Sequence, residues 1–418
     1  MVAETDGLDI AVIGAGIIGV SIALRLAAEG HRVLLLDRAG AGEGCSKGNA
    51  GHIAVEHIIP LARPATVAAM PRMLLDNNGP LRIDWRYLPQ LLPWLARFLW
   101  AARPVSMRRG MAALAALHAG VMPAFDRLDR EHDLSAFLRR AGNLVVAGTA
   151  RGFRAARAEA ATLRRWGFAS EILSGPALRS FDPVLSQELA GGVFYPGSAH
   201  VTDPHGLVRH LFEACLARGA TYRQRTVAAI GAGSDGFVLH CAEAAPVRTR
   251  RLVIAAGAWS ARLLRPLGYR LPLDTERGYH LMLGAPTVTP RVPTTIQEQR
   301  FVLTPMRHGL RLAGRVEFAG LERPMDRRQA ERLLPLAQQV CPALAAGSAE
   351  AWMGFRPTFP DFLPVIGRAP RHDGLYFAFG HQHLGLTQSA VTAEITADLV
   401  AGRTPAIDIA PFSAARFA

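Results

Sequence analysis

The sequence predicts an α/β protein, α+β over its whole length, in which a Rossmann-like dinucleotide-binding domain joins a second domain with an antiparallel sheet and helices. Three observations support this fold class. A glycine-rich turn lies between an apolar strand and a helix near Gly14, and residues 278–318 alternate apolar and polar side chains as antiparallel strands do. The length of 418 residues also exceeds what a single hydrophobic core usually organises.

The elements of the N-terminal part follow from local patterns. Residues 8–13 form a short branched apolar run that is typical of a buried parallel strand. Apolar residues at helical spacing predict a helix over 17–29, ended by Gly30. A second strand over 32–36 completes a βαβ unit, and frequent prolines predict several short helices between residues 60 and 140.

Helical and strand-like segments alternate further along the chain. The expected elements are helices over 151–166 and 204–218, short strands over 221–256, antiparallel strands over 278–283, 294–306 and 309–318, a helix over 326–340, a loop over 353–374, a strand over 375–380 and a helix over 387–400. The sequence contains no internal repeat, which argues against a solenoid or propeller.

The formal net charge of +13 would suit a protein that binds nucleic acid or an anionic membrane. Lys47 is however the only lysine, and the arginines are scattered along the chain, so we expect no nucleic-acid partner. The cysteines Cys45, Cys215, Cys241 and Cys341 are far apart and form no C-x-x-C pair. This spacing predicts neither a zinc site nor a disulfide framework, and it favours a cytoplasmic location.

Residues 88–102, LPQLLPWLARFLWAA, are the most lipid-like segment of the chain. The segment is too short to span a bilayer and contains Arg97 and two prolines. We expect a buried or surface-packed helix, with peripheral contact to the inner face of the membrane as the alternative. Residues 1–20 have no basic region before their apolar stretch, so they do not resemble an export signal.

The turn over residues 14–19, GAGIIG, is a G-x-G-x-x-G motif placed between a strand and a helix. Gly14 permits the tight turn, Gly16 lets a pyrophosphate approach the backbone, and Gly19 lets helix and strand pack closely. The backbone amides at the start of the helix, near Ile17 and Ile18, would donate to that pyrophosphate. The motif predicts a dinucleotide site.

Asp37 ends the second strand, 23 positions after Gly14, and is placed to bind a ribose diol. A carboxylate there would repel a 2′-phosphate, so FAD or NAD is favoured over NADP. Arg38 either stacks near the adenine or faces water.

Residues 44–52, GCSKGNAGH, resemble the S-x-x-N-A-G loop of the D-amino-acid oxidase and dehydrogenase family of flavoproteins, which also includes glycine, sarcosine and hydroxyproline enzymes. Four later stretches match that family in the same order, namely 200–204 (HVTDP), 253–260 (VIAAGAWS), 354–367 (GFRP through Ile366-Gly367) and 380–387 (GHQHLGLT). The last stretch looks most like bacterial D-amino-acid and hydroxy-D-proline dehydrogenases.

The resemblance implies that the cofactor is FAD and that the Rossmann-like domain is of the glutathione-reductase type. It also implies a discontinuous FAD-binding domain of residues 1–58, 199–271 and 352–418, with residues 59–198 and 272–351 forming the substrate-binding domain. The glycine turn and the resemblance together assign FAD contacts to Gly14, Gly16, Ile17, Ile18, Gly19, Asp37, Arg38, Ser46, Asn49, Ala50, Gly51, Val227, Ala256, Gly257, Trp259, Gly380, Leu384, Gly385, Leu386 and Thr387.

The family binds the substrate carboxylate through an arginine in the G-F-R-P motif, which is Arg356 here. The turn over 380–387 opens a helix, so its amides would stabilise negative charge at the flavin N1–C2 carbonyl. Further candidate active-site residues are Tyr279, His280, His52, His381 and His383. Strand alternation predicts that only one of Tyr279 and His280 reaches the ligand.

The resemblance implies oxidation of the carbon–nitrogen bond of a D-amino acid or of a substrate of the hydroxy-D-proline type. A hydride would pass to flavin N5 and leave an imine, which then gives an oxo-acid. One alternative is an enzyme for the N-substituted glycines sarcosine and iminodiacetate, or for glycine. Iminodiacetate would need a second cation, and Arg277, Arg300 and Arg307 are all nearby in sequence. An alternative of another class is a flavin-dependent tRNA-modifying protein.

The expected partners are a small amino- or imino-acid substrate and an electron acceptor, which is oxygen, a quinone or a partner protein. No metal ion is expected. The oligomeric state and covalent attachment of FAD, for which Cys45 and His52 lie in the appropriate loop, stay open.

Overall fold

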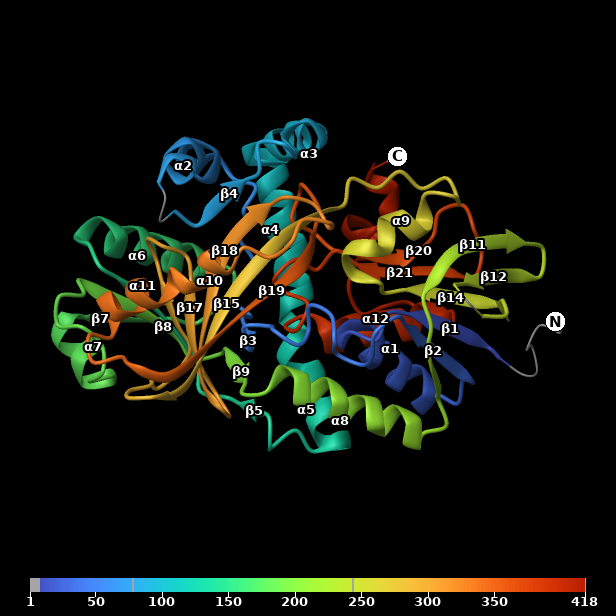
Figure 1. Cartoon of the computed structure of the whole chain (residues 1–418), viewed down its shortest axis with the longest axis horizontal. Helices are drawn as coiled ribbons and strands as arrows, with labels where there is room; N and C mark the ends of the chain where they lie inside the picture. Colours follow the sequence, from blue (N-terminus) through green and yellow to red (C-terminus); the bar gives the residue numbers. More distant parts are fainter. Residues whose placement is uncertain (1–7, 77–78, 243, 418) are drawn as a thin grey trace.

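A computed structural model describes residues 8–76, 79–242 and 244–417 of the chain. Two large sheets organise two lobes, which lie at the left and right of Figure 1. The right-hand lobe contains a six-stranded sheet whose strands are parallel except for the last pair. Its order is β10 (Thr221–Gln224), β2 (Val33–Asp37), β1 (Ile10–Ile13), β14 (Arg251–Ile254), β21 (Leu375–Phe379) and β20 (Val365–Arg368).

The first βαβ unit has the predicted form, with helix α1 (Ile17–Ala28) between β1 and β2. Helices α8 (Pro204–Ala217) and α12 (Ser389–Val400) pack against α1. Nearly all of α1 is buried, because it lies between the sheet and these two helices. The N-terminus of α1 is therefore held rigidly at the carboxyl end of β1.

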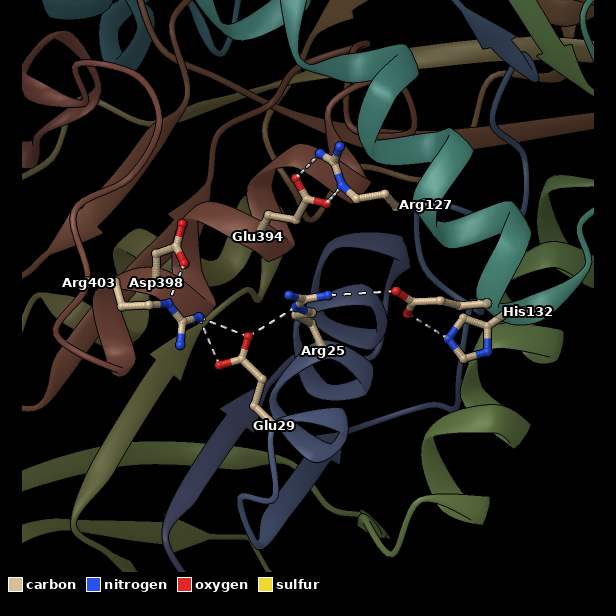
Figure 2. Close-up of polar contacts among 8 residues, drawn as sticks. Arg25, Glu29, Arg127, His132, Glu394, Asp398 and Arg403 are labelled. Atoms are coloured by element: carbon tan, nitrogen blue, oxygen red, sulfur yellow. Dashed lines mark hydrogen bonds and ion pairs between the residues drawn. The ribbon is translucent and has the colours of Figure 1, made fainter.

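Charged side chains join α1 and α12 to helix α5 (Val121–His132) at the lobe's surface, as Figure 2 shows. Arg127 donates two hydrogen bonds of 2.7 Å to Glu394, and Arg403 lies 2.9 Å from Glu29. These groups are partly exposed, so each pair contributes at most about 1 kcal/mol. The pairs set the mutual orientation of helices that are already held by apolar packing.

The left-hand lobe contains a nine-stranded sheet that is mostly antiparallel, as the sequence predicts. Its order is β19 (Ala346–Thr358), β15 (Asp274–Pro286), β18 (Gly309–Phe318), β17 (Val302–Met306), β16 (Thr294–Ile296), β6 (Asn143–Ala147), β8 (Gly191–Tyr195) and β7 (Glu171–Ser174), with β4 (Leu81–Ile83) paired to β18. The α/β fold class is confirmed.

Short helices follow one another between the two lobes and over the left-hand sheet. They are α2 (Pro64–Leu75), α3 (Leu88–Ala101), α4 (Pro104–Ala119), α6 (Ala150–Arg165), α7 (Gly175–Phe181), α10 (Arg327–Glu331) and α11 (Leu333–Val340). Helix α9 (Ser260–Leu264) lies in the right-hand lobe. Two small sheets complete the fold, one of β3 (His52–Ile53), β9 (Ala199–Val201) and β5 (Leu138–Arg139), the other of β11 (Val227–Gly233), β12 (Gly236–Cys241) and β13 (Val247–Thr249). Within the described ranges, no helix has both the length and the apolar character that crossing a bilayer requires.

The prediction of a loop over residues 353–374 was wrong. Strand β19 continues to Thr358, and β20 lies inside the same range. The whole length of β19 pairs with β15, and these long-range hydrogen bonds outweigh the weak local strand signal of a proline-containing segment. β19 also runs across the domain boundary expected at residue 352, and the domain division stays a prediction.

Two other predicted elements are interrupted. The strand expected over 294–306 divides into β16 and β17 around a turn, and the helix expected over 326–340 divides into α10 and α11. Pro335 lacks the backbone N–H that would bond to the carbonyl of Glu331, so the helix breaks before it.

Candidate active site

Two cavities lie end to end between the lobes and share Asn49 and Gln382 in their linings. The first, here called the nucleotide cavity, has a volume of about 390 Å³ and is bounded by the glycine turn and the end of β2. The second, the substrate cavity, has a volume of about 340 Å³ and is bounded by β15, β18 and β19. A long cofactor held in the first cavity would therefore extend toward the second.

The glycines of the first turn are required by close packing. Gly14 has φ +108°, and a Cβ on it would lie 2.3 Å from the carbonyl oxygen of Ala255 on the neighbouring strand. A Cβ on Gly19 would lie 1.8 Å from the carbonyl oxygen of Gly14. The helix can thus begin directly above the strand ends only because both side chains are absent.

Asp37 fixes the same turn through its side chain. Its Oδ2 accepts a hydrogen bond of 2.8 Å from the amide of Ala15, and its Oδ1 accepts one of 2.8 Å from the amide of Ala39. Oδ1 also accepts a bond of 3.4 Å from the amide of Gly40, so it is Oδ2 that keeps a second lone pair to accept from a ribose hydroxyl. Ser46 lies nearby, and its Oγ accepts a bond of 2.9 Å from the amide of Ile17.

The far end of the nucleotide cavity is lined by Arg38 and Trp259. The Arg38 guanidinium lies 3.7 Å above the ring of Trp259 on an exposed side chain, and the choice between stacking near the adenine and facing water stays a prediction. Val227, Ala256 and Gly257 line the cavity beside them. Small and apolar groups here leave a flat slot in which a planar ring can pack.

The second turn closes the nucleotide cavity from the C-terminal side. Gly380 has φ +84°, and a Cβ on it would lie 2.3 Å from the ring of Phe359. Thr387 Oγ1 accepts a bond of 3.1 Å from the amide of Ala54 and donates one of 3.2 Å to the carbonyl of His52. The C-terminal turn and the loop after Gly51 are therefore tied together by one hydroxyl.

Most of the residues expected to contact FAD lie at these cavities. The nucleotide cavity is lined by Gly14, Gly16, Ile17, Ile18, Asp37, Arg38, Ser46, Asn49, Val227, Ala256, Gly257, Trp259, Gly380, Gly385 and Leu386, and the substrate cavity by Asn49, Ala50 and Leu384. Gly19, Gly51 and Thr387 line neither cavity, and their places in the fold position the residues that do.

Arg356 lies half-buried on β19 and lines the substrate cavity. Its guanidinium lies over Gly278 of the adjacent strand, where a Cβ would come within 2.3 Å of its Cζ. It has no hydrogen bond and no ion pair within the described part of the chain. A half-buried guanidinium without a hydrogen-bond or ion-pair partner suits an anionic ligand.

Three of the predicted histidines are buried or partly buried, and their surroundings hold them neutral. His52 and His383 line the substrate cavity, and burial lowers the pKa of each well below its usual value, with further contributions from His57. His381 lines the nucleotide cavity, and burial lowers its pKa to about 3. Its Nε2 lies 3.2 Å from Oγ1 of Thr392. These rings are uncharged at neutral pH.

Tyr279 and His280 line neither cavity. Tyr279 is 1% exposed on the core-facing side of β15, where its hydroxyl donates a bond of 2.6 Å to Oε2 of Glu317. His280 faces the other side, where its Nδ1 lies 2.9 Å from the carbonyl oxygen of Gly48 and its ring stacks on Trp352 at 4.9 Å. The two side chains point to opposite faces of β15, as strand alternation predicts. The backbone at Gly48 covers His280.

The three arginines near the substrate sheet lie in different environments. Arg277 is fully buried and bonds to Glu317 at 3.2 Å, and Arg307 donates to the carbonyl of Ala136. Arg300 lines the substrate cavity, and its guanidinium has neither a hydrogen bond nor an ion pair with any described residue. Of Arg277, Arg300 and Arg307, it is therefore Arg300 that can serve beside Arg356 as a second cation in the cavity.

Sequence reasoning missed a second group of polar residues at the substrate cavity, Glu56, His57, Glu276 and Gln382. Nε2 of His52 and His57 lie 3.6 and 3.9 Å from Oε1 of Glu56, and the ligand atoms of all three lie within 4.8 Å of one another, so they could hold a metal ion. Glu56 already accepts hydrogen bonds from Asn143 and Ser198, which satisfies the carboxylate without an ion. Only the short H-x-x-x-E-H spacing in the sequence pointed to this cluster.

This architecture, with a dinucleotide site next to an arginine-bearing cavity, defines a nucleotide-dependent oxidoreductase. The family model described as FAD dependent oxidoreductase (DAO) matches residues 9–399, so the chain belongs to that family. FAD is the cofactor of the family, and the glycine turns, where a Cβ would meet backbone or Phe359, fit it. The predicted family, enzyme class and cofactor are confirmed.

Curated relatives and solved structures agree with this family. A D-amino-acid oxidase of Bradyrhizobium diazoefficiens is 34% identical over 99% of both chains, and D-amino acid dehydrogenase 2 of Ralstonia nicotianae is 32% identical over 98% of this chain and 100% of its own. Glycine oxidase from Geobacillus kaustophilus has the same fold, with a TM-score of 0.73, 24% identity and 97% coverage of both chains. Iminodiacetate oxidase from Chelativorans sp. BNC1 also has a TM-score of 0.73, at 20% identity over 97% of this chain and 98% of its own.

Proposed function

We propose that this protein oxidises the carbon–nitrogen bond of a small amino or imino acid of the D-amino-acid or hydroxy-D-proline type. FAD, when bound, supplies the acceptor for the hydride that leaves the carbon next to nitrogen. The imine left behind gives an oxo-acid on hydrolysis, or stays cyclic where the substrate is a ring. The names of the most similar curated relatives support this substrate class.

The observation that carries the proposal is the unpaired guanidinium of Arg356 in the substrate cavity. Its planar fork would bind the carboxylate of an amino acid through two charge-assisted hydrogen bonds. Apolar side chains such as Leu61, Leu81 and Phe98 line much of the rest of the cavity and would accept a small hydrocarbon side chain or ring. Binding at Arg356 would orient the reacting carbon, so the protein contributes mainly position.

Arg356→Gln tests this proposal. Loss of a bidentate charged contact costs about 3–5 kcal/mol, so kcat/KM should fall by about three orders of magnitude while FAD stays bound. Arg307→Gln is the matched control, because Arg307 lies outside both cavities and should leave kcat/KM unchanged. Activity within a factor of three of the wild type in Arg356→Gln would contradict the proposal.

A second candidate substrate carries two carboxylates, as iminodiacetate does. Arg300 favours it, because this unpaired cation lines the same cavity as Arg356. Anaerobic mixing of the purified protein with D-alanine, D-proline, hydroxy-D-proline, glycine, sarcosine and iminodiacetate, followed by flavin absorbance, separates the candidates. If iminodiacetate is the substrate, it will bleach the flavin faster than sarcosine, and Arg300→Gln will abolish that preference.

We also propose peripheral contact with an anionic membrane through the face formed by α2, α3 and the start of α4, which stands at the top of Figure 1. Exposed apolar side chains gather there, namely Leu75, Trp85, Leu92, Leu99, Trp100 and Val105. Exposed arginines lie among them, namely Arg86, Arg97, Arg103, Arg108 and Arg109. Apolar groups with interleaved cations are suited to the interface of an anionic bilayer, and docking would place the protein near a quinone acceptor.

Vesicle sedimentation tests this contact. The protein should bind vesicles of phosphatidylcholine and phosphatidylglycerol more strongly than vesicles of phosphatidylcholine alone, and Leu99→Ser with Trp100→Ser should reduce binding at least tenfold. Trp166→Ser is the control, since Trp166 is exposed on a different face. Equal binding by the double variant and the wild type would rule out this surface.

A further inference from the structure

Glu276 is a buried carboxylate in the wall of the substrate cavity. It lies on β15, is 3% exposed, and belongs to the same cavity lining as Arg356 and His383. Alternation along the strand places Glu276 on the cavity side and Arg277 on the opposite side, where Arg277 bonds to Glu317. Glu276 therefore faces any ligand that Arg356 binds.

The Glu276 carboxylate has no hydrogen bond and no ion pair with any of the residues that the structure describes. Two other glutamates of similar burial do have hydrogen-bond partners. Glu317 accepts from Tyr279 and Arg277, and Glu56 accepts from Asn143 and Ser198. A carboxylate buried without a partner is unfavourable unless a ligand supplies the missing donor.

The position of Glu276 relative to Arg356 matches the charge pattern of an α-amino acid. The two residues are direct partners in the antiparallel register of β15 and β19, so their Cβ atoms are about 5 Å apart. The guanidinium lies over Gly278, and both side chains line the same cavity. An α-amino acid carries its carboxylate and its ammonium on the same carbon. Arg356 can bind the carboxylate while the neighbouring Glu276 binds the ammonium.

The ammonium group must lose a proton before the substrate can be oxidised, because the nitrogen lone pair forms the C=N bond. Burial raises the pKa of Glu276 to about 7, despite the opposing influence of Arg356. A group with a pKa near the working pH serves best as a proton acceptor.

We propose that Glu276 binds the substrate ammonium and takes one proton from it. This inference rests on the proposed function. The N–H bond breaks and an O–H bond forms on the Glu276 carboxyl, which leaves a neutral amine. With FAD bound as the hydride acceptor, the C–H bond on the neighbouring carbon would break, its electron pair would leave as a hydride, and the nitrogen lone pair would form the C=N bond of an iminium ion.

The test is the pH dependence of anaerobic flavin reduction by D-proline, with D-alanine as a second probe, in the wild type and Glu276→Gln. Without a proton acceptor, only the neutral amine in solution is productive, and its fraction falls about tenfold for each pH unit below the amine pKa. The variant should therefore be slower by about 100-fold or more at pH 7, and it should approach the wild type near pH 10.

A carboxylate without an amine separates proton transfer from a structural role. Propionate should bind Glu276→Gln at least as tightly as the wild type, because Arg356 is untouched. Equal rates at pH 7, an equal loss at every pH, or weaker propionate binding in the variant would each overturn the inference. Failure of both probes to reduce the wild-type flavin would instead refute the proposed function, so the two failures are distinguishable.

Discussion

His118 on α4 gives the clearest prediction of how acidity destabilises this protein. The ring is 2% exposed, its Nδ1 lies 2.9 Å from the carbonyl oxygen of Val55, and its Nε2 lies 3.0 Å from the side-chain nitrogen of Gln388. Burial lowers the pKa of His118 from 6.5 to about 4. The folded protein therefore keeps this ring neutral at pH values where the unfolded chain protonates it.

The sign of the effect follows from proton binding. Between pH 6.5 and about 4 the unfolded chain binds a proton at His118 that the folded protein does not, so the free energy of unfolding falls as the pH falls through this window. At pH 5 the loss from this one residue amounts to about 2 kcal/mol, and it reaches about 3 kcal/mol below pH 4.

The perturbation is His118→Gln, measured by urea unfolding of the FAD-bound protein at pH 7.5 and pH 5. At pH 7.5 the variant should be less stable by about 1–2 kcal/mol, because a buried hydrogen bond is lost. Between pH 7.5 and pH 5 it should lose about 2 kcal/mol less stability than the wild type. An identical pH dependence in the two proteins would refute the reasoning, since all other titrating groups are shared.

Three further outcomes follow from the nucleotide cavity. Gly14→Ala should abolish FAD binding and give a colourless protein. Gly30→Ala is the control and should stay yellow, because Gly30 also has a positive φ but no atom lies within 4 Å of an added Cβ. A yellow Gly14→Ala protein would contradict the close-packing argument. Asp37→Asn should weaken FAD binding about tenfold in a fluorescence titration, because the charge that accepts from the glycine turn and the ribose is lost; unchanged affinity would remove that role. Thr387→Val should lower the free energy of unfolding by about 1–3 kcal/mol, because the amide of Ala54 and the carbonyl of His52 lose their hydrogen-bond partner. The variant should also release FAD faster. Equal release rates would show that the Thr387 hydroxyl does not hold the C-terminal turn in place.

Local sequence was sufficient at the nucleotide end. The glycine spacing and the acidic residue after the second strand depend on backbone geometry within one βαβ unit, and Gly14, Gly19 and Asp37 occupy the expected places. Arg356 of the G-F-R-P motif lines the substrate cavity, and its role in binding a carboxylate stays a prediction.

Long-range pairing decided the rest of the substrate cavity. Tyr279 and His280 were equally plausible from the sequence, and the structure directs one into the core and covers the other with the carbonyl of Gly48, more than two hundred positions away. Glu276 gave no sequence signal, since a glutamate in a strand is usually a solvated surface residue.

The sequence by itself determined the class of fold, the nucleotide turn and the family. These depend on residues a few positions apart, whose effect on the backbone is local. Only the tertiary structure decided which polar groups meet in the substrate cavity and which of them lack a partner. Burial and pairing depend on strands and loops brought together from distant parts of the chain, and these contacts raise the pKa of Glu276 and bring Arg356 to the substrate cavity.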